Sequence, residues 1–238
     1  MKLALDLILA AIVAMAVWNG YKKGLIMGIG GIVVLVVSVI IGSTLSTAYS
    51  QEVITAMRPF ASGYTERLLT QSVYDTLGIE ESEYSVEDLL TQNPQLGEKA
   101  AVGALEELGL SGDVAAAMAG EAAAKAKAGS ESLSDSLTDV VCARVAFAVA
   151  FLLFFLLSVI ILTVIGNITN LSFRIPYLGI GNEIGGALCG LVEGILFCLV
   201  AAWALRFMGI LFPDGVLQET AILSRLMENN PLADYLGI

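Results

Sequence analysis

Four long apolar runs, separated by polar segments, dominate the hydrophobic pattern of this chain. The runs cover residues 3–18, 24–42, 140–165 and 184–212. An α-helix rises about 1.5 Å per residue, so about 20 apolar residues cross the hydrocarbon core of a bilayer. The first run reaches that length only with its flanking residues. The pattern therefore predicts an all-α integral membrane protein with four transmembrane helices.

Short polar connections pair these helices into two hairpins. Residues 19–23 form a polar turn between the first two runs. Pro176 lies between the last two runs and ends the preceding helical structure, because proline cannot continue a helix, and the next helix begins near Asn182. The expected parts are hairpin one (1–47), a helical insertion (48–138), hairpin two (139–212) and an interfacial C-terminal helix (213–238).

Short helices are predicted within the insertion. Ser85 and Asp88 have the spacing of a capping box, and Pro94 marks a break after it. The alanine-rich residues 100–128 form two helices of good propensity, interrupted at residues 109–112. We expect these helices to lean on one another or on a partner, as a solvated helical cap.

The C-terminal segment is predicted to lie on the membrane surface rather than to cross it. Asp214 can cap a short helix there, and one face of that helix carries Val216, Thr220, Leu223 and Met227.

The first apolar run has an alternative interpretation as a cleaved signal peptide. Ala14, Met15 and Ala16 resemble a cleavage site, but only Lys2 precedes the run and Asp6 interrupts it. We therefore expect this run to remain as the first transmembrane helix.

The basic residues of the short loops predict the orientation through the positive-inside rule. These loops carry Lys22, Lys23 and Arg174. Both turns are then cytoplasmic, whereas both termini and the insertion are extracytoplasmic. Lys2 and Arg225 oppose this orientation.

The negative charge is concentrated in the insertion. The chain is 57% hydrophobic with a net charge of −11, and residues 48–138 hold 15 of the 23 acidic and 5 of the 12 basic residues. The sequence has no basic tract for nucleic acid or anionic lipid headgroups, so we expect no nucleic acid partner. The expected partners are the lipid bilayer around the helices and envelope or secretion proteins at the insertion.

The sequence carries no motif for catalysis, cofactor binding or metal binding. It has no histidine, which is the most frequent general base and zinc ligand. Its three cysteines, Cys142, Cys189 and Cys198, lie in apolar runs, where cysteines act as packing residues. Nucleotide-binding and hydrolase motifs are missing too. We therefore expect no enzyme, no cofactor and no metal.

Glycines repeat on one face of two predicted helices. The first set is Gly20, Gly24, Gly28 and Gly31, and the second is Gly186, Gly190 and Gly194. A spacing of four residues aligns small residues on one side of a helix and lets a neighbouring backbone approach closely. The repeats therefore predict close helix packing.

Four charged residues interrupt the apolar runs. Asp6, Arg144 and Arg206 each lie near the extracytoplasmic end of their helix, so they either form an ion cluster at that membrane face or snorkel independently. Glu193 lies near the middle of the last helix, at a depth where the other helices have no basic residue. It is expected to be neutral, to face a water path or to meet a partner.

Several of these features occur together in an order that one known family shows. Asp6 is followed by residues 20–25 (GYKKGL), and the second half has residues 175–179 (IPYLG), Asn182 and the glycine repeat. The chain thus resembles the CvpA (colicin V production protein) family. The resemblance implies a multi-pass protein of the bacterial inner (cytoplasmic) membrane, associated with toxin peptide production or export and with envelope function.

Two function classes remain open at this point. One is an accessory or scaffold protein in toxin export and envelope function, which the resemblance and the acidic insertion favour. The alternative is a small-solute or proton-coupled transporter or channel that uses Glu193. Four helices leave little interior for a pore, which favours a homo-oligomer.

Overall fold

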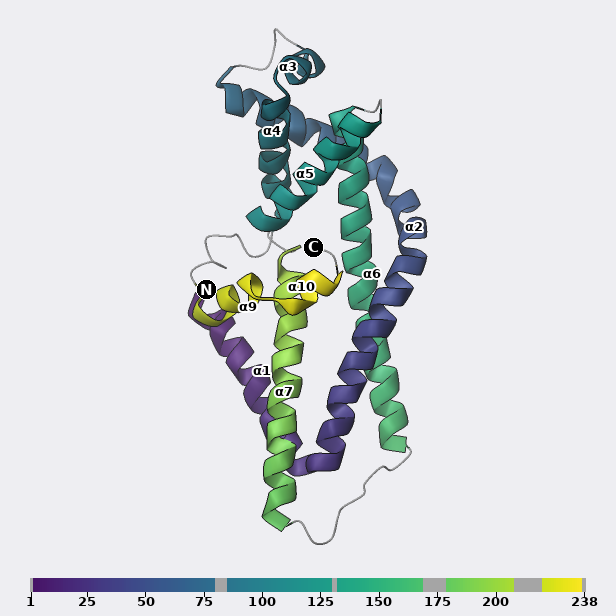
Figure 1. The fold of residues 1–238 in the computed structure, drawn as a ribbon, viewed down its shortest axis with the longest axis vertical. Coiled ribbons are helices and arrows are strands. Elements are labelled where there is room, and N and C mark those ends of the chain that lie inside the picture. Colours follow the sequence, from purple (N-terminus) through teal and green to yellow (C-terminus); the bar gives the residue numbers. More distant parts are fainter. Residues whose placement is uncertain (1, 80–84, 130–131, 169–178, 208–219, 237–238) are drawn as a thin grey trace. The chain divides into compact units, whose positions relative to one another are not determined.

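All regular structure in the described part of the chain is α-helical. The computed structural model describes residues 2–79, 85–129, 132–168, 179–207 and 220–236. Its helices are α1 (Lys2–Lys23), α2 (Leu25–Leu77), α3 (Val86–Gln92), α4 (Pro94–Glu107), α5 (Gly112–Ala128), α6 (Leu133–Ile168), α7 (Gly179–Leu205), α9 (Ala221–Glu228) and α10 (Pro231–Leu236) (Figure 1). The predicted all-α class is confirmed. Arg174, Pro176, Asp214 and Val216 lie outside the described residues.

Four of the described helices are long and apolar enough to cross a membrane. The corresponding segments are Leu5–Lys23, Leu25–Leu77, Leu133–Asn167 and Ile180–Leu205. Each overlaps one of the four apolar runs of the sequence, so the predicted number of such helices is confirmed for the part of the chain that the structure describes.

The chain divides into two compact units. The first contains the described residues of Met1–Thr47, Val149–Ala204 and Gly215–Gly237, and the second those of Ala48–Ala148 and Leu205–Asp214. Both α2 and α6 contribute residues to each unit.

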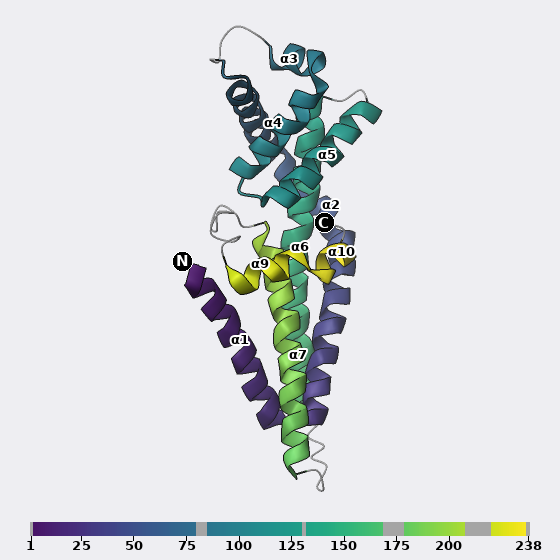
Figure 2. The same ribbon diagram turned by 60° about the vertical axis from the view of Figure 1, so that its left-hand side comes forward.

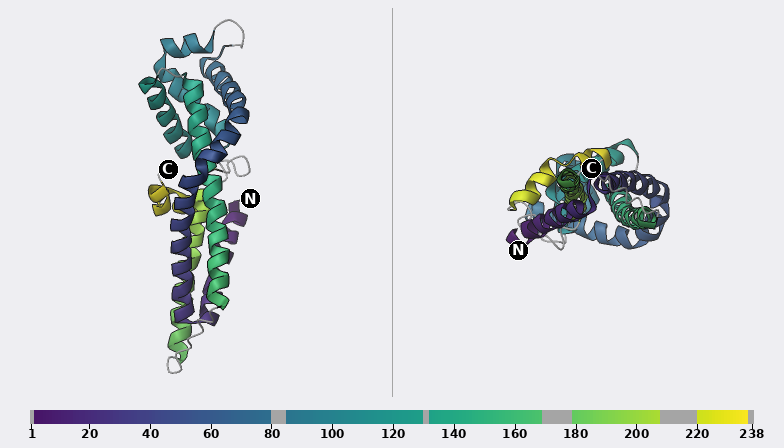
Figure 3. Two further views of the ribbon diagram at one scale, coloured as in Figure 1. Left: turned by 90° about the vertical axis from the view of Figure 1, so that its right-hand side faces the viewer. Right: turned by 90° about the horizontal axis from the view of Figure 1, so that it is seen from below.

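In the first unit, the N-terminal part of α2 and the C-terminal part of α6 run beside α7 (Figure 3). Helices α9 and α10 cross α7, and the side-chain amide of Asn230 donates a hydrogen bond of 2.9 Å to the carbonyl oxygen of Leu199 (Figure 1). This bond satisfies a buried polar side chain and holds the C-terminal segment on α7. The expected single C-terminal helix is thus two short helices in the described residues.

Two helix boundaries, at the end of α1 and at the end of α2, differ from the sequence prediction. Residues 19–23 were expected to form a turn, but they complete the last turn of α1, and the chain bends only at Gly24. The second helix was expected to end near Gly42, whereas α2 continues to Leu77 through Pro59. The run of apolar residues ends near Gly42, but a helix needs only satisfied backbone bonds and a packing surface, and the second unit supplies that surface.

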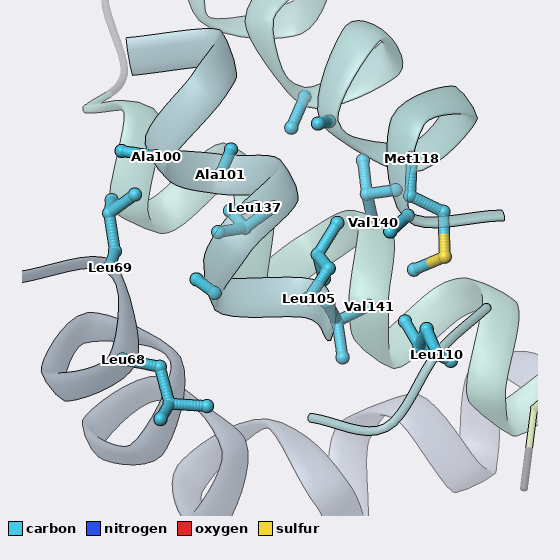
Figure 4. Close-up of a cluster of buried hydrophobic side chains, with 14 of the residues drawn as sticks. Leu68, Leu69, Ala100, Ala101, Leu105, Leu110, Met118, Leu137, Val140 and Val141 are labelled. Atoms are coloured by element: carbon cyan, nitrogen blue, oxygen red, sulfur yellow. The ribbon is translucent and has the colours of Figure 1, made fainter. Parts of the chain in front are cut away.

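The second unit has a hydrophobic core of its own, formed by α4, α5, the C-terminal part of α2 and the first turns of α6 (Figure 4). Leu69 from α2, Leu105 from α4, Met118 from α5 and Leu137 from α6 are each 2% exposed or less. Four short alanine side chains, Ala100, Ala101, Ala115 and Ala119, let α4 and α5 pack closely. The core explains why the unit extends to Ala148, past the predicted end of the insertion at residue 138.

Helix boundaries inside the second unit follow the predicted turn signals. Ser85 is the N-cap of α3, although its side chain makes no capping bond, so the capping box itself is not formed. Pro94 occupies the first position of α4, where its missing N–H costs nothing. Residues 108–111 separate α4 from α5, and Gly109 has the positive φ of 83° that this turn needs.

Polar contacts tie the same helices together. The hydroxyls of Thr65 and Thr138 share a hydrogen bond of 2.5 Å between α2 and α6. Asp139 pairs with Arg58 of α2 at 2.9 Å and with Lys125 of α5. These contacts fix the directions of α2, α5 and α6 around the core of the second unit.

Candidate functional site

The junction between α1 and α2 depends on Gly24 and Asn182. The backbone angle φ of Gly24 is 82°, a value that residues other than glycine rarely adopt. The side-chain oxygen of Asn182 accepts a hydrogen bond of 2.9 Å from the N–H of Leu25, which is the first residue of α2. Asn182 thus caps α2 from a helix that is distant in the sequence. A Cβ on Gly24 would lie 2.4 Å from the amide nitrogen of Asn182, so the two residues fit only as a pair.

The glycines of α1 and α7 bring the two backbones into contact, as predicted (Figure 2). A Cβ on Gly20 would lie 2.2 Å from the carbonyl oxygen of Gly186, and a Cβ on Gly190 would lie 2.3 Å from that of Ala16. Gly194 continues the contact, since its Cβ would meet the Cα of Val13 at 3.0 Å. Any side chain at these positions would separate the helices.

Two glycines of α2 face the same helix from another direction. A Cβ on Gly28 would lie 2.6 Å from the Cβ of Cys189, and a Cβ on Gly31 would lie 2.8 Å from a carboxylate oxygen of Glu193. The four glycines of the first set were expected on one helical face. They instead lie on α1, at the bend and on α2, yet each of them packs against α7.

A cavity of about 410 Å³ lies beside Glu193 in the first unit. It is lined by α2, α6 and α7, together with Lys23 at the end of α1. Its polar lining includes Glu193, Lys23, Thr163 and Asn167, and the remaining walls are largely apolar. Glu193 is half-buried there, so its carboxylate has lost part of its contact with water.

Lys23 is the residue of this site that sequence reasoning missed. The depth of Glu193 along its helix suggested that no basic residue comes near it, but Lys23 lines the same cavity. Lys23 is the last residue of α1, and its long side chain lets the ammonium reach away from the helix end toward the cavity. The break at Gly24, which turns α2 back along α7, could have indicated this proximity.

Asp6 has a structural partner in place of the predicted ion cluster. Its carboxylate accepts hydrogen bonds from the backbone N–H groups of Ala221, Ile222 and Leu223 at 2.9, 3.2 and 3.4 Å. These are the first three residues of α9, whose N-terminal N–H groups have no partner within the helix. The positive end of the helix dipole also favours a carboxylate there. Asp6 therefore caps α9.

The two arginines of the predicted cluster also have separate partners. Arg144 pairs with Glu121 of α5 at 2.7 Å. Arg206, which is buried, pairs with Asp113 at 3.4 Å, and its carbonyl oxygen accepts a hydrogen bond from the N–H of Ser111. The three described side chains therefore do not form the ion cluster that the sequence left open as one of two alternatives. The two arginines hold α5 in the second unit, since each reaches an acidic side chain of that helix.

Lys22 lies apart from the cavity. Its ammonium is 5.0 Å from the centre of the Trp18 ring, which is a cation–π distance. Both side chains are exposed on α1, as expected for residues near the end of a membrane-crossing helix. The described residues contain no group of three or more side chains that could hold a metal ion.

A family model supports the resemblance noted in the sequence. The model of the colicin V production protein family matches residues 109–231. The chain belongs to this family. The match includes Asn182, Glu193 and the α7 glycines, as well as α5 of the second unit, whereas the Asp6 and 20–25 motifs lie outside it. Family membership and the four apolar helices identify the chain as a membrane protein. No curated protein and no solved structure matches the chain.

Proposed function

We propose that the chain is a multi-pass protein of the bacterial inner membrane that serves as an accessory or scaffold protein in toxin peptide production or export and in envelope function. The second unit is the observation that carries this proposal, because it is a helical module with its own buried core. The family to which the chain belongs supports the link to toxin production.

The proposed topology has two transmembrane hairpins, in residues 1–47 and 139–212, with residues 48–138 on the extracytoplasmic side. The boundary between the two units at Thr47 and Ala48 supports this division. Lys22 and Lys23 at the end of α1 support cytoplasmic turns, by the positive-inside rule.

The proposed partners of the second unit are envelope or secretion proteins. The apolar faces of α4 and α5 are buried in its core, so the charged residues of these helices remain at the surface. Glu106 and Glu107 are both exposed at the end of α4. An acidic surface favours association with basic partners and increases the rate of their encounter.

Charge reversal on α4 tests this proposal in a strain that lacks its own copy of the protein. The double variant Glu106→Lys, Glu107→Lys should lower secretion of a co-expressed peptide toxin at an unchanged amount of membrane-inserted protein. The matched control Glu228→Lys, Asp234→Lys makes the same change of charge at exposed positions of α9 and α10, and it should secrete normally.

Two results would count against the proposal. If the α4 variant secretes the toxin at the parental level, the acidic surface has no role in secretion. Envelope function is measured as resistance of the cells to detergent. If the strain without any copy secretes the toxin and resists detergent like the parent, the accessory function as a whole is refuted.

A further inference from the structure

The Glu193 cavity has the size and lining of a small-molecule site. Its volume of about 410 Å³ falls within the range of about 300–1,000 Å³ that is usual for such sites. Most of its wall is apolar and includes Val159, Leu162 and Phe197. A few polar groups on apolar walls are typical of a site that orients a ligand of mixed character.

The two charged side chains of the cavity are not paired with each other. Glu193 and Lys23 form no ion pair, and neither has a hydrogen bond or ion pair to another described residue. Glu193 is half-buried, so its carboxylate has lost part of its hydration, a loss that a hydrogen bond or an opposite charge normally offsets, whereas Lys23 is exposed. A ligand's ammonium would supply the partner that Glu193 lacks, and the exposed ammonium of Lys23 is available to an anionic group of the same ligand.

The volume argues against a single small ion as the occupant. Water takes about 30 Å³ per molecule in the liquid, so the cavity has room for roughly a dozen waters. A lone cation would leave the apolar wall and Lys23 without a partner. A ligand with one ammonium, one anionic group and an apolar part satisfies all three.

We propose that the cavity binds a small zwitterion that carries an apolar group, with the ligand's ammonium at Glu193 and its anionic group at Lys23. Two sources supply this chemistry. One is a free apolar α-amino acid such as leucine, and the other is the headgroup of phosphatidylethanolamine with its acyl chains along the apolar wall. The test separates these sources.

Binding is measured on the purified full chain with both probes. Equilibrium dialysis in detergent measures the affinity for radiolabelled leucine. Native mass spectrometry, after incubation with phosphatidylethanolamine or with phosphatidylcholine, detects retained lipid. Phosphatidylcholine is the matched lipid control, because its quaternary ammonium cannot donate a hydrogen bond to Glu193.

The charge-removing variants Glu193→Gln and Lys23→Gln should each weaken binding of the retained probe by about tenfold or more, as expected for loss of a charge-assisted hydrogen bond. The controls Glu183→Gln and Lys22→Gln make the same chemical changes outside the cavity and should bind like the parent. Glu183 is exposed on α7, and Lys22 lies over Trp18.

The outcomes are distinct. Leucine binding assigns the site to a free amino acid, and selective retention of phosphatidylethanolamine assigns it to a lipid. If a charge variant does not fold, Val159→Trp fills the cavity from α6 and should abolish binding while both charges remain. Failure of the parent to bind either probe, or unchanged binding by the folded cavity variants, overturns the proposal.

Discussion

Replacing Gly186 by alanine is the sharpest test of the contact between α1 and α7. A Cβ at this position would lie 2.2 Å from the carbonyl oxygen of Gly20 and 2.7 Å from the Cα of Gly24. Both are backbone atoms, so no rotation of a side chain can relieve the clash. Helix α1 must therefore retreat.

The size of the retreat follows from these distances. Ordinary van der Waals contact begins at 3.4 Å, so the backbones must separate by roughly 1 Å. A gap of that size forfeits about a quarter to a half of the dispersion energy of the atoms involved, and overpacking of this kind costs about 1–3 kcal/mol. Alanine is itself about 1 kcal/mol better than glycine within a helix, which offsets part of the loss.

Gly30→Ala is the matched control for this substitution. Gly30 lies within α2, and a Cβ there would meet nothing within 4 Å. This control gains the helix propensity of alanine without a clash, so the free energies of unfolding of the two variants should differ by about 1–3 kcal/mol.

Unfolding in mixed detergent and dodecyl sulfate micelles measures this difference, with tryptophan fluorescence as the signal. Trp18 on α1 and Trp203 on α7 report on the two helices concerned. Equal unfolding midpoints for Gly186→Ala and Gly30→Ala would show that the close approach of the backbones adds no stability, and the packing argument would then fail.

Two further predictions concern the cap of α9 and the topology. Asp6→Ala should lower the free energy of unfolding by about 0.5–2 kcal/mol and speed hydrogen exchange at the amides of Ala221 to Leu223, whereas Asp6→Asn, which still offers an acceptor oxygen, should lose less. Equal exchange rates in Asp6→Ala and the parent would refute the cap. Single cysteines at Lys22 and at Ala117, in a chain whose native cysteines are replaced, should react with an impermeant reagent from opposite sides of the membrane. Ala117 is chosen because it is exposed on α5, whereas the neighbouring Ala115 is fully buried. Reaction of both from one side contradicts the two-hairpin topology.

The sequence by itself determined the helical class, the four apolar segments and the glycine contact. These features depend on local patterns. A run of apolar residues predicts a membrane-crossing helix whatever lies next to it, and glycines at a spacing of four share a helical face without reference to their partner. The break between α4 and α5 could also be predicted from a local pattern, because Gly109 can adopt the positive φ of the turn without help from distant residues.

The tertiary structure alone decided which charged residues meet. The sequence left open whether Asp6 meets an arginine or stands alone, but Asp6 caps α9, and Arg144 and Arg206 each pair with a carboxylate of α5. Counting residues along each helix placed Asp6, Arg144 and Arg206 at a similar depth in the membrane, which made a contact between them possible. Depth says nothing about the rotation of each helix or about the segment that packs against it, and those two properties select the partner.

The same limit applies to the cavity and to the length of α2. Lys23 and Glu193 come from different helices, and their shared cavity depends on the bend at Gly24 and on the cap that Asn182 supplies. Hydropathy predicted an end of α2 near Gly42, yet its polar continuation buries Leu69 and Val73 in the core of the second unit. Both outcomes rest on contacts between residues that are distant in the sequence. Such contacts depend on the register and rotation of packed helices, which a one-dimensional pattern does not contain.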